Sequence, residues 1–305
     1  MFQQSFSWIP VLAGMTKCYG FTKNNHMTDT KPRLQSPTGT CDTHMHIFEP
    51  QYAPLPGANL PAMPGTIAAY RVLRERLGIT RTVIVQPTAY GKDNRCTLAA
   101  MQALADERHQ TRGVAIVLPE DSDAEIARLT AAGIRGIRYH LLPGGGVQWE
   151  TLETMAARVA PQGWHVQIQL DGRELAGREA LLKKLPCDIV IDHIGRFMQP
   201  VAADDAGWLA LRRLVDGGRC WIKLSAPYHG SKTGAPCYDD AGELARQLIR
   251  AAPERMLYAT NWPHPSLKSG FPDDAALLDL LNDWAGSEAV RRQILVDNPA
   301  RLYGF

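Results

Sequence analysis

The chain has 305 residues, of which 45% are hydrophobic and 21% are charged, a composition typical of a globular protein with a sizeable core. Its 33 basic and 31 acidic residues give a net charge of +2 without a long basic run, which gives no indication of a nucleic-acid surface. No stretch approaches the length of apolar sequence that a membrane span needs, so we expect none. The six cysteines are scattered, with no C-x-x-C pair, and we expect reduced thiols in a cytoplasmic protein.

The first 39 residues differ from the rest of the chain. Residues 1–10 lack the early basic residues of a signal peptide, and residues 28–39 are polar and rich in proline and glycine. Met27 looks like a more natural start than Met1. We therefore expect residues 1–39 to form a poorly ordered extension, of which residues 1–26 lie upstream of the true start, and residues 40–305 to form a single catalytic domain.

From residue 40 onward, short apolar runs rich in β-branched residues alternate with amphipathic segments. The expected strands are residues 40–44, 82–86, 113–117, 136–140, 164–170, 188–193, 220–225 and 256–261. The expected helices are residues 66–77, 94–108, 122–132, 149–160, 173–185, 208–215 and 240–251, with two more after residues 273 and 287. This alternation predicts an α/β fold, a (β/α)8 TIM barrel. A doubly wound sheet is the alternative, but no glycine-rich phosphate turn follows the first strand.

Two connections stand out because they follow strand ends. Residues 49–65 form a long loop with many prolines, and such loops often act as lids. Gly144, Gly145 and Gly146 follow the fourth strand without the spacing of a phosphate-binding motif. We interpret them as a flexible active-site loop or, equally well, as a plain turn.

Polar side chains recur where the expected strands end, and these ends meet at one mouth of a barrel. The first strand leads into His44-Met45-His46, and residues two apart on a strand face the same side. Later strand ends contribute Gln86, Arg138, His140, Gln169, Asp192, His193, Lys223 and Asn261, with Tyr90 and Tyr228 just beyond. We expect His109 and His229 at the surface and His165 packed outward against a helix.

The strand-end motifs resemble those of the amidohydrolase superfamily. The His-x-His of the first strand, Ile191-Asp-His-Ile-Gly195 and Asn261-Trp-Pro-His-Pro265 are similar to the branch that contains 2-pyrone-4,6-dicarboxylate lactonase and the sugar lactonases. The stretches 85–98, 136–145, 163–172 and 220–228 resemble lactone isomerases of this branch. The resemblance covers residues 40–305 and implies an amidohydrolase-like TIM barrel.

Two departures from the superfamily pattern bear on the chemistry. Gln169 stands where metal-using members carry a histidine ligand, and Asn261 stands where they carry an aspartate. Without that carboxylate, a metal loses charge balance and a water nucleophile loses its usual base. We therefore expect no catalytic metal and no cofactor, although His44, His46 and His193 still offer three imidazoles.

These features predict a lactone isomerase of galacturonate catabolism that interconverts D-galactaro-1,5-lactone and D-galactaro-1,4-lactone by intramolecular acyl transfer. The expected catalytic residues are His44, His46, His193 and Asn261. The expected substrate-binding residues are Gln86, Tyr90, Arg138, His140, Gln169, Lys223 and Tyr228. Arg138 is the first choice for the distal carboxylate, because a guanidinium matches a carboxylate bidentately, and Lys223 is the second.

Two alternatives remain open. The first is a hydrolase acting on a sugar lactone or on 2-pyrone-4,6-dicarboxylate, with or without a metal. The second is a barrel that binds sugar acids without turnover. In each case we expect a small-molecule ligand, no nucleic acid and no membrane as partners, and a homo-oligomer is possible.

Overall fold

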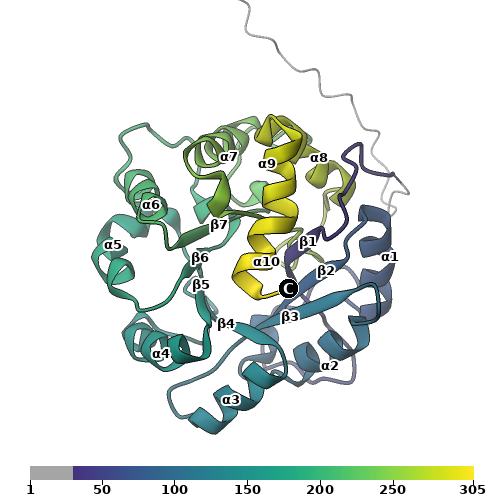
Figure 1. The fold of residues 1–305 in the computed structure, drawn as a ribbon, viewed down its shortest axis with the longest axis vertical. Helices are drawn as coiled ribbons and strands as arrows, with labels where there is room; N and C mark the ends of the chain where they lie inside the picture. Colours follow the sequence, from purple (N-terminus) through teal and green to yellow (C-terminus); the bar gives the residue numbers. More distant parts are fainter. Residues whose placement is uncertain (1–29) are drawn as a thin grey trace, which may run out of the picture.

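The computed structural model describes residues 30–305, so the expectation for residues 1–26 lies outside it. Eight parallel strands follow one another around a barrel in chain order. They are β1 (Cys41–Met45), β2 (Arg81–Val85), β3 (Gln110–Ala115), β4 (Ile134–His140), β5 (His165–Gln169), β6 (Ile189–Ile191), β7 (Cys220–Leu224) and β8 (Met256–Tyr258). The predicted TIM barrel is confirmed, and helices surround the strands in Figure 1.

The helices fall close to the expected ranges. They are α1 (Ile67–Leu77), α2 (Arg95–Leu104), α3 (Asp123–Ala131), α4 (Leu152–Val159), α5 (Leu175–Lys184), α6 (Ala206–Asp216), α7 (Asp239–Ala251), α8 (Asp274–Ala285), α9 (Glu288–Arg292) and α10 (Asn298–Tyr303). Helix α2 ends earlier than the expected Arg108. The reason is that the Asp106 carboxylate accepts hydrogen bonds from the backbone N–H groups of Arg108 and His109, which favours a turn over another helical turn.

The barrel closes between β1 and the residues that follow β8. The backbone N–H of Asn261 donates to the His44 carbonyl at 2.9 Å, and that of His46 donates to the Trp262 carbonyl at 2.9 Å. The His-x-His segment and Asn261 therefore lie side by side although more than two hundred residues separate them in the chain.

Helix α10 covers the opening at the amino ends of the strands, across the centre of the barrel in Figure 1. Its Tyr303 packs among interior residues such as Cys41, Val83 and Val114. The ring of His165, the first residue of β5, makes an edge contact with Tyr303 at 5.2 Å between ring centroids. His165 therefore points into the barrel, not outward as expected, because it shares its side of the strand with Gln167 and Gln169.

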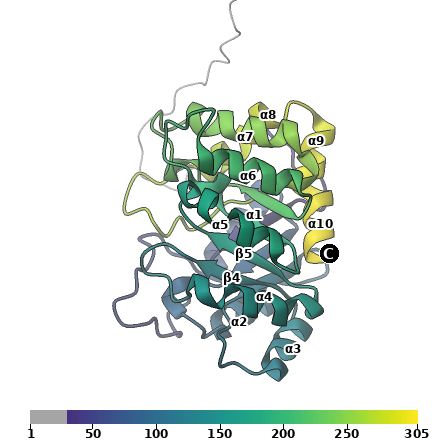
Figure 2. The same ribbon diagram turned by 90° about the vertical axis from the view of Figure 1, so that its left-hand side faces the viewer.

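The opposite opening is covered by the long loop after β1, so the two ends of the barrel differ, as Figure 2 shows from the side.

Part of the expected extension, residues 30–39, packs on the barrel. Leu34 is buried, and its N–H donates to Asp279 Oδ1 at 2.8 Å. Cys41, Cys96, Cys187 and Cys220 are free thiols, whereas Cys237 is disulfide-bonded, so the expectation of reduced thiols is wrong at this residue. Within residues 30–305, no helix combines the length and apolar character needed to cross a membrane.

Candidate active site

A bulge in β1 sets the direction of the two histidines. The pairing of β1 with β2 shifts between Asp42 and Met45, so Cys41 near the bottom and His44 near the top both face the barrel interior. The buried Asp42 carboxylate holds this bulge, because it accepts from the backbone N–H groups of His44 and Thr260 at 3.1 and 3.0 Å. Burial raises the Asp42 pKa to about 6.

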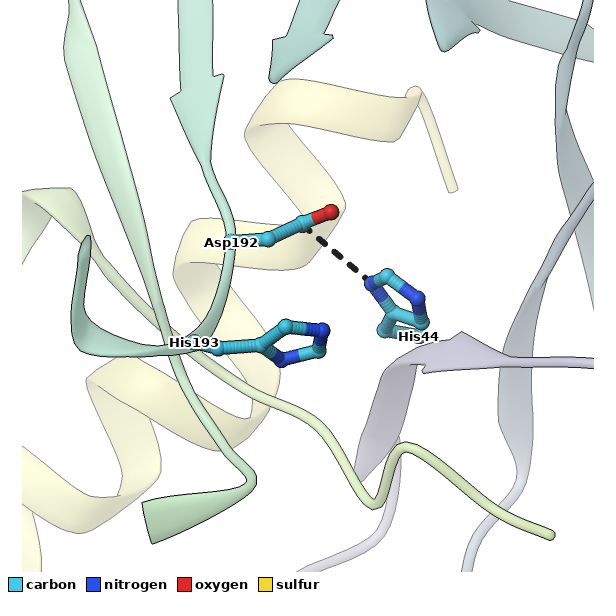
Figure 3. A group of neighbouring side chains, drawn as sticks. All are labelled: His44, Asp192 and His193. Atoms are coloured by element: carbon cyan, nitrogen blue, oxygen red, sulfur yellow. Dashed lines mark hydrogen bonds and ion pairs between the residues drawn. The ribbon is translucent and has the colours of Figure 1, made fainter. Parts of the chain in front are cut away.

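His44 and His46 meet through their Nε2 atoms, which lie 3.2 Å apart. The Nδ1–H of His46 donates to the Val85 carbonyl at 2.8 Å, which leaves Nε2 of His46 as the proton-accepting nitrogen. On the other side, Nδ1 of His44 lies 3.2 Å from Asp192 Oδ1, as Figure 3 shows. Burial lowers the pKa of His46 to about 3, so this imidazole is neutral at pH 7.

Lys223 lies below the histidines and does not reach the cavity. Its side chain is fully buried, and Nζ donates to Gln167 Oε1 at 2.6 Å. Nζ also lies 3.3 Å from His44 Nδ1 and 3.6 Å from Asp192 Oδ1. Burial lowers the Lys223 pKa to about 8, although the Asp192 carboxylate opposes this shift.

His44, Asp192 and His193 place one potential metal-ligand atom each within 4.8 Å of one another, and Figure 3 shows the three side chains converging. The donor set nevertheless does not fit a catalytic zinc ion. The carboxylate of this group already faces the Lys223 amine at 3.6 Å, and the side chains of His44 and Asp192 are fully buried, which leaves no open position toward a substrate.

A left-handed turn after β6 places the next two side chains. The φ angles of His193, Ile194, Gly195 and Arg196 are 58°, 56°, 73° and 51°. Such a run is costly, above all for the β-branched Ile194, and strained backbone of this kind is frequent at functional sites. The turn directs His193 to Ser225, with Nδ1 and Oγ 2.8 Å apart, and brings Arg196 to the cavity wall.

A cavity of about 540 Å³ opens above the histidines. Its polar lining consists of His46, Asn59, Thr88, Arg138, His140, Gln169, Arg196, His229, Asn261 and Ser266. No aspartate or glutamate is among the described residues that line it, whereas two arginines are. The Nε atoms of Arg138 and Arg196 are buried without a hydrogen-bond partner. The cavity therefore suits an anionic ligand with several hydroxyl groups.

The expected site residues fall into three groups in the structure. His46, Arg138, His140, Gln169 and Asn261 line the cavity. His44, His193 and Lys223 are buried beside or beneath it and contact the first group or one another. Gln86, Tyr90 and Tyr228 do not line it.

These last three side chains support other parts of the site. Gln86 Nε2 donates to the Gly91 and Asp93 carbonyls, each at 2.9 Å, and so holds the loop after β2. The Tyr90 hydroxyl donates to the Glu49 carbonyl at 3.3 Å, and Tyr228 contacts Asn261.

Among the basic residues that line the cavity, sequence reasoning missed two. Arg196 was not among the expected site residues, and its place at the cavity depends on a turn that no propensity rule anticipates. His229 was expected at the surface, but it lines the cavity with its ring centroid 5.1 Å from that of His193. Its position just after β7, beside the expected site residue Tyr228, was the available signal.

The Gly144–Gly146 segment forms part of the cavity wall and contains a tight turn. The N–H of Gly145 donates to the Leu142 carbonyl at 3.0 Å. A Cβ atom at Gly145 would lie 1.7 Å from the His140 carbonyl oxygen, so a side chain cannot be accommodated there. The glycine lets this loop approach His140 closely.

Comparison with known proteins agrees with this architecture. The chain belongs to the amidohydrolase family, whose model matches residues 41–305. It is 36% identical to a D-galactarolactone isomerase from Agrobacterium fabrum, with 91% of this chain and 95% of that protein covered. It is 34% identical to a 2-pyrone-4,6-dicarboxylate hydrolase from Comamonas testosteroni, with 90% and 93% covered. A solved apo structure from Agrobacterium tumefaciens superposes with a TM-score of 0.83 at 36% identity, with 90% and 98% covered.

Proposed function

We propose that this protein is a lactone isomerase that converts D-galactaro-1,5-lactone into D-galactaro-1,4-lactone without a metal ion. The observation that carries the proposal is the absence of a carboxylate from the described cavity lining, together with an amide, Asn261, at the end of the last strand. A hydrolase needs a base for water, and a carboxylate at this position is the natural one. An internal acyl transfer has its nucleophile already bound.

In the proposed reaction the 4-hydroxyl of the substrate attacks the C1 carbonyl. The O4–C1 bond forms, the C1–O5 bond breaks, and one proton moves from O4 to O5, so no water is consumed. A nucleophile held within the substrate gains an advantage of roughly 7–11 kcal/mol in favourable cases.

His46 is the best-placed proton carrier, because it lines the cavity and its Nε2 carries no proton; taking the substrate proton breaks the 3.2 Å contact of this atom with Nε2 of His44. His44 and Asp192 lie behind it, so positive charge that develops on the histidine pair faces a buried carboxylate. A bound substrate carboxylate adds negative charge to the cavity and raises the His46 pKa above its low resting value.

Arg138 and Arg196 are assigned to the substrate carboxylate at C6. Arg138 is fixed by donation from one terminal nitrogen to the Gln86 carbonyl at 2.5 Å and from the other to Gln169 Oε1 at 3.2 Å. These bonds leave its Nε without a partner. His140 and Gln169 are assigned to hydroxyl groups. The proposal places the enzyme in the cytoplasm, within galacturonate catabolism.

The test is an NMR time course on galactaro-1,5-lactone with enzyme treated with EDTA. We expect the 1,4-lactone to form first, at the rate of the untreated enzyme, and galactarate to follow only slowly. Direct release of galactarate would favour the hydrolase, the function named for the Comamonas testosteroni relative. Loss of activity on EDTA treatment with recovery on adding zinc would contradict the metal-free reaction.

A further inference from the structure

Behind Asn261 lies a chain of buried polar groups that the reaction above does not use. Asn261 Nδ2 lies 2.9 Å from the Tyr228 hydroxyl oxygen. That oxygen lies 2.9 Å from Nδ1 of His264, and Nε2 of His264 lies 3.2 Å from Asp274 Oδ1. His264 is fully buried, and Asp274 is the first residue of α8. These four side chains thus connect the first residue of α8, outside the barrel, to the cavity.

The chemistry of these groups indicates the direction of the contacts. His264 Nε2 and Asp274 Oδ1 lie at ion-pair distance without hydrogen-bond geometry, and the charge of the carboxylate favours the proton of neutral His264 on Nε2. Nδ1 of His264 is then an acceptor, and the Tyr228 hydroxyl donates to it. The Tyr228 oxygen in turn accepts from Asn261 Nδ2, since an amide nitrogen only donates.

The same logic settles which atom of Asn261 the substrate meets. One side of the amide is held by Tyr228, and Asn261 lines the cavity. The backbone supports this placement, because Asn261 and His264 both have left-handed φ angles, 60° and 58°, and the His264 N–H donates to the Asn261 carbonyl at 2.8 Å. The turn therefore holds Asn261 and His264, the two residues that contact the Tyr228 hydroxyl.

We propose that Tyr228, His264 and Asp274 are positioning residues that orient the Asn261 amide with Oδ1 toward the cavity. Asn261 then accepts a hydrogen bond from the attacking 4-hydroxyl and directs its oxygen to the C1 carbonyl. This inference rests on the proposed isomerisation and adds a role to residues that touch no substrate.

The central test is a double-mutant cycle with Tyr228→Phe and Asn261→Gly, assayed on galactaro-1,5-lactone. Glycine is chosen because it tolerates the left-handed φ of residue 261. Tyr228→Phe frees the amide to rotate. We expect kcat to fall about tenfold, which corresponds to the free energy of one hydrogen bond, and KM to stay nearly unchanged. In the Asn261→Gly background the same change should have no further effect.

Tyr258→Phe is the matched control, because it removes a buried hydroxyl from β8 that has no hydrogen-bond partner. It should keep the wild-type kcat, and thermal melting should show all variants folded. A second variant, Asp274→Asn, removes the negative charge that favours the proton on Nε2 of His264 and so weakens acceptance by Nδ1 from Tyr228. It should lower kcat as Tyr228→Phe does. Additive effects of Tyr228→Phe and Asn261→Gly, or an unchanged kcat in Tyr228→Phe, would overturn the proposal.

A spectroscopic measurement separates this inference from the proposed function. The side-chain amide signals of Asn261, assigned by their loss in Asn261→Gly, should include one proton that exchanges slowly with water. Tyr228→Phe should abolish that protection whether or not the lactone is a substrate. Unprotected amide protons in the wild type would refute the contact chain, whereas a protected amide in an enzyme that fails to isomerise the lactone would refute only the reaction.

Discussion

At the scale of single residues, charge decides what the cavity can hold. Arg196 reaches the cavity only because four successive residues adopt left-handed backbone angles. Its Nε has no hydrogen-bond partner within the described structure, so its guanidinium is available to a ligand. Arg138, in contrast, is already held by two donated bonds and serves as a fixed wall of the cavity.

We therefore expect Arg196→Gln to raise KM for the lactone by about ten- to a hundredfold, which corresponds to the free energy of a charge-assisted hydrogen bond. The effect on kcat should be small. Steady-state kinetics would check this, with Arg128→Gln on α3 as an exposed control. Esterifying the substrate carboxylate should abolish the difference between wild type and Arg196→Gln. An equal loss on the ester would mean that Arg196 does not bind that carboxylate.

At the scale of elements, two irregular segments shape the site. The bulge in β1 directs His44 inward, and the loop of residues 49–64 covers the cavity. This loop is held at its base by the Phe48 N–H, which donates to the Gly65 carbonyl at 2.8 Å. Further along, the Leu55 N–H donates to the Ala89 carbonyl at 2.7 Å, so that Leu55 forms part of the cavity wall.

Because Leu55 is an apolar part of this cover, Leu55→Ser should admit water and divert turnover from isomerisation to hydrolysis. We expect the ratio of galactarate to 1,4-lactone, followed by NMR, to rise severalfold. Leu60→Ser provides a matched control, since Leu60 lies in the same loop and is 44% exposed but does not line the cavity. An unchanged ratio in Leu55→Ser would show that this cover does not control access of water.

The regular elements were predictable because their signals are local. Alternating apolar runs predicted all eight strands, and side chains such as Thr66, Ser122 and Asp273 marked helix starts that the structure confirms. That His44 and His46 face the same side followed from the two-residue spacing.

Features that depend on tertiary contacts were not predictable. The left-handed turn that delivers Arg196 has no sequence signature apart from Gly195. The bulge at Asp42 and the support of Asn261 by Tyr228 join segments that are far apart in the chain. His165, in contrast, could have been placed inside, because it shares its side of the strand with Gln167; its edge contact with Tyr303 could not have been predicted.

At the scale of the whole molecule, buried imidazoles make stability depend on pH. Burial lowers the pKa of His46, His140, His165 and His229 to about 3 in the folded state. The unfolded chain binds these protons near pH 6.5, so the stability that neutral imidazoles provide is present above pH 6.5 and lost as pH falls toward 3. Asp42, with its pKa raised to about 6, acts in the opposite direction but is a single group.

Burial also lowers the pKa of His44 and His193, so six histidines contribute. Urea unfolding between pH 7.5 and 5 should therefore show a free energy of unfolding that falls steeply below pH 6.5, with a net uptake of roughly five protons. His165→Leu should reduce that uptake by about one proton. A free energy that stays constant across this range would contradict the neutral state of these buried histidines.

The central claim is that the cavity transfers an acyl group within its substrate and keeps water out of the bond-forming step. Turnover of galactaro-1,5-lactone in ¹⁸O-labelled water, followed by mass spectrometry of the 1,4-lactone, tests it most directly. The account predicts a 1,4-lactone with no ¹⁸O, because only substrate oxygens take part. A product that carries ¹⁸O would show hydrolysis followed by re-closure, and would contradict the account.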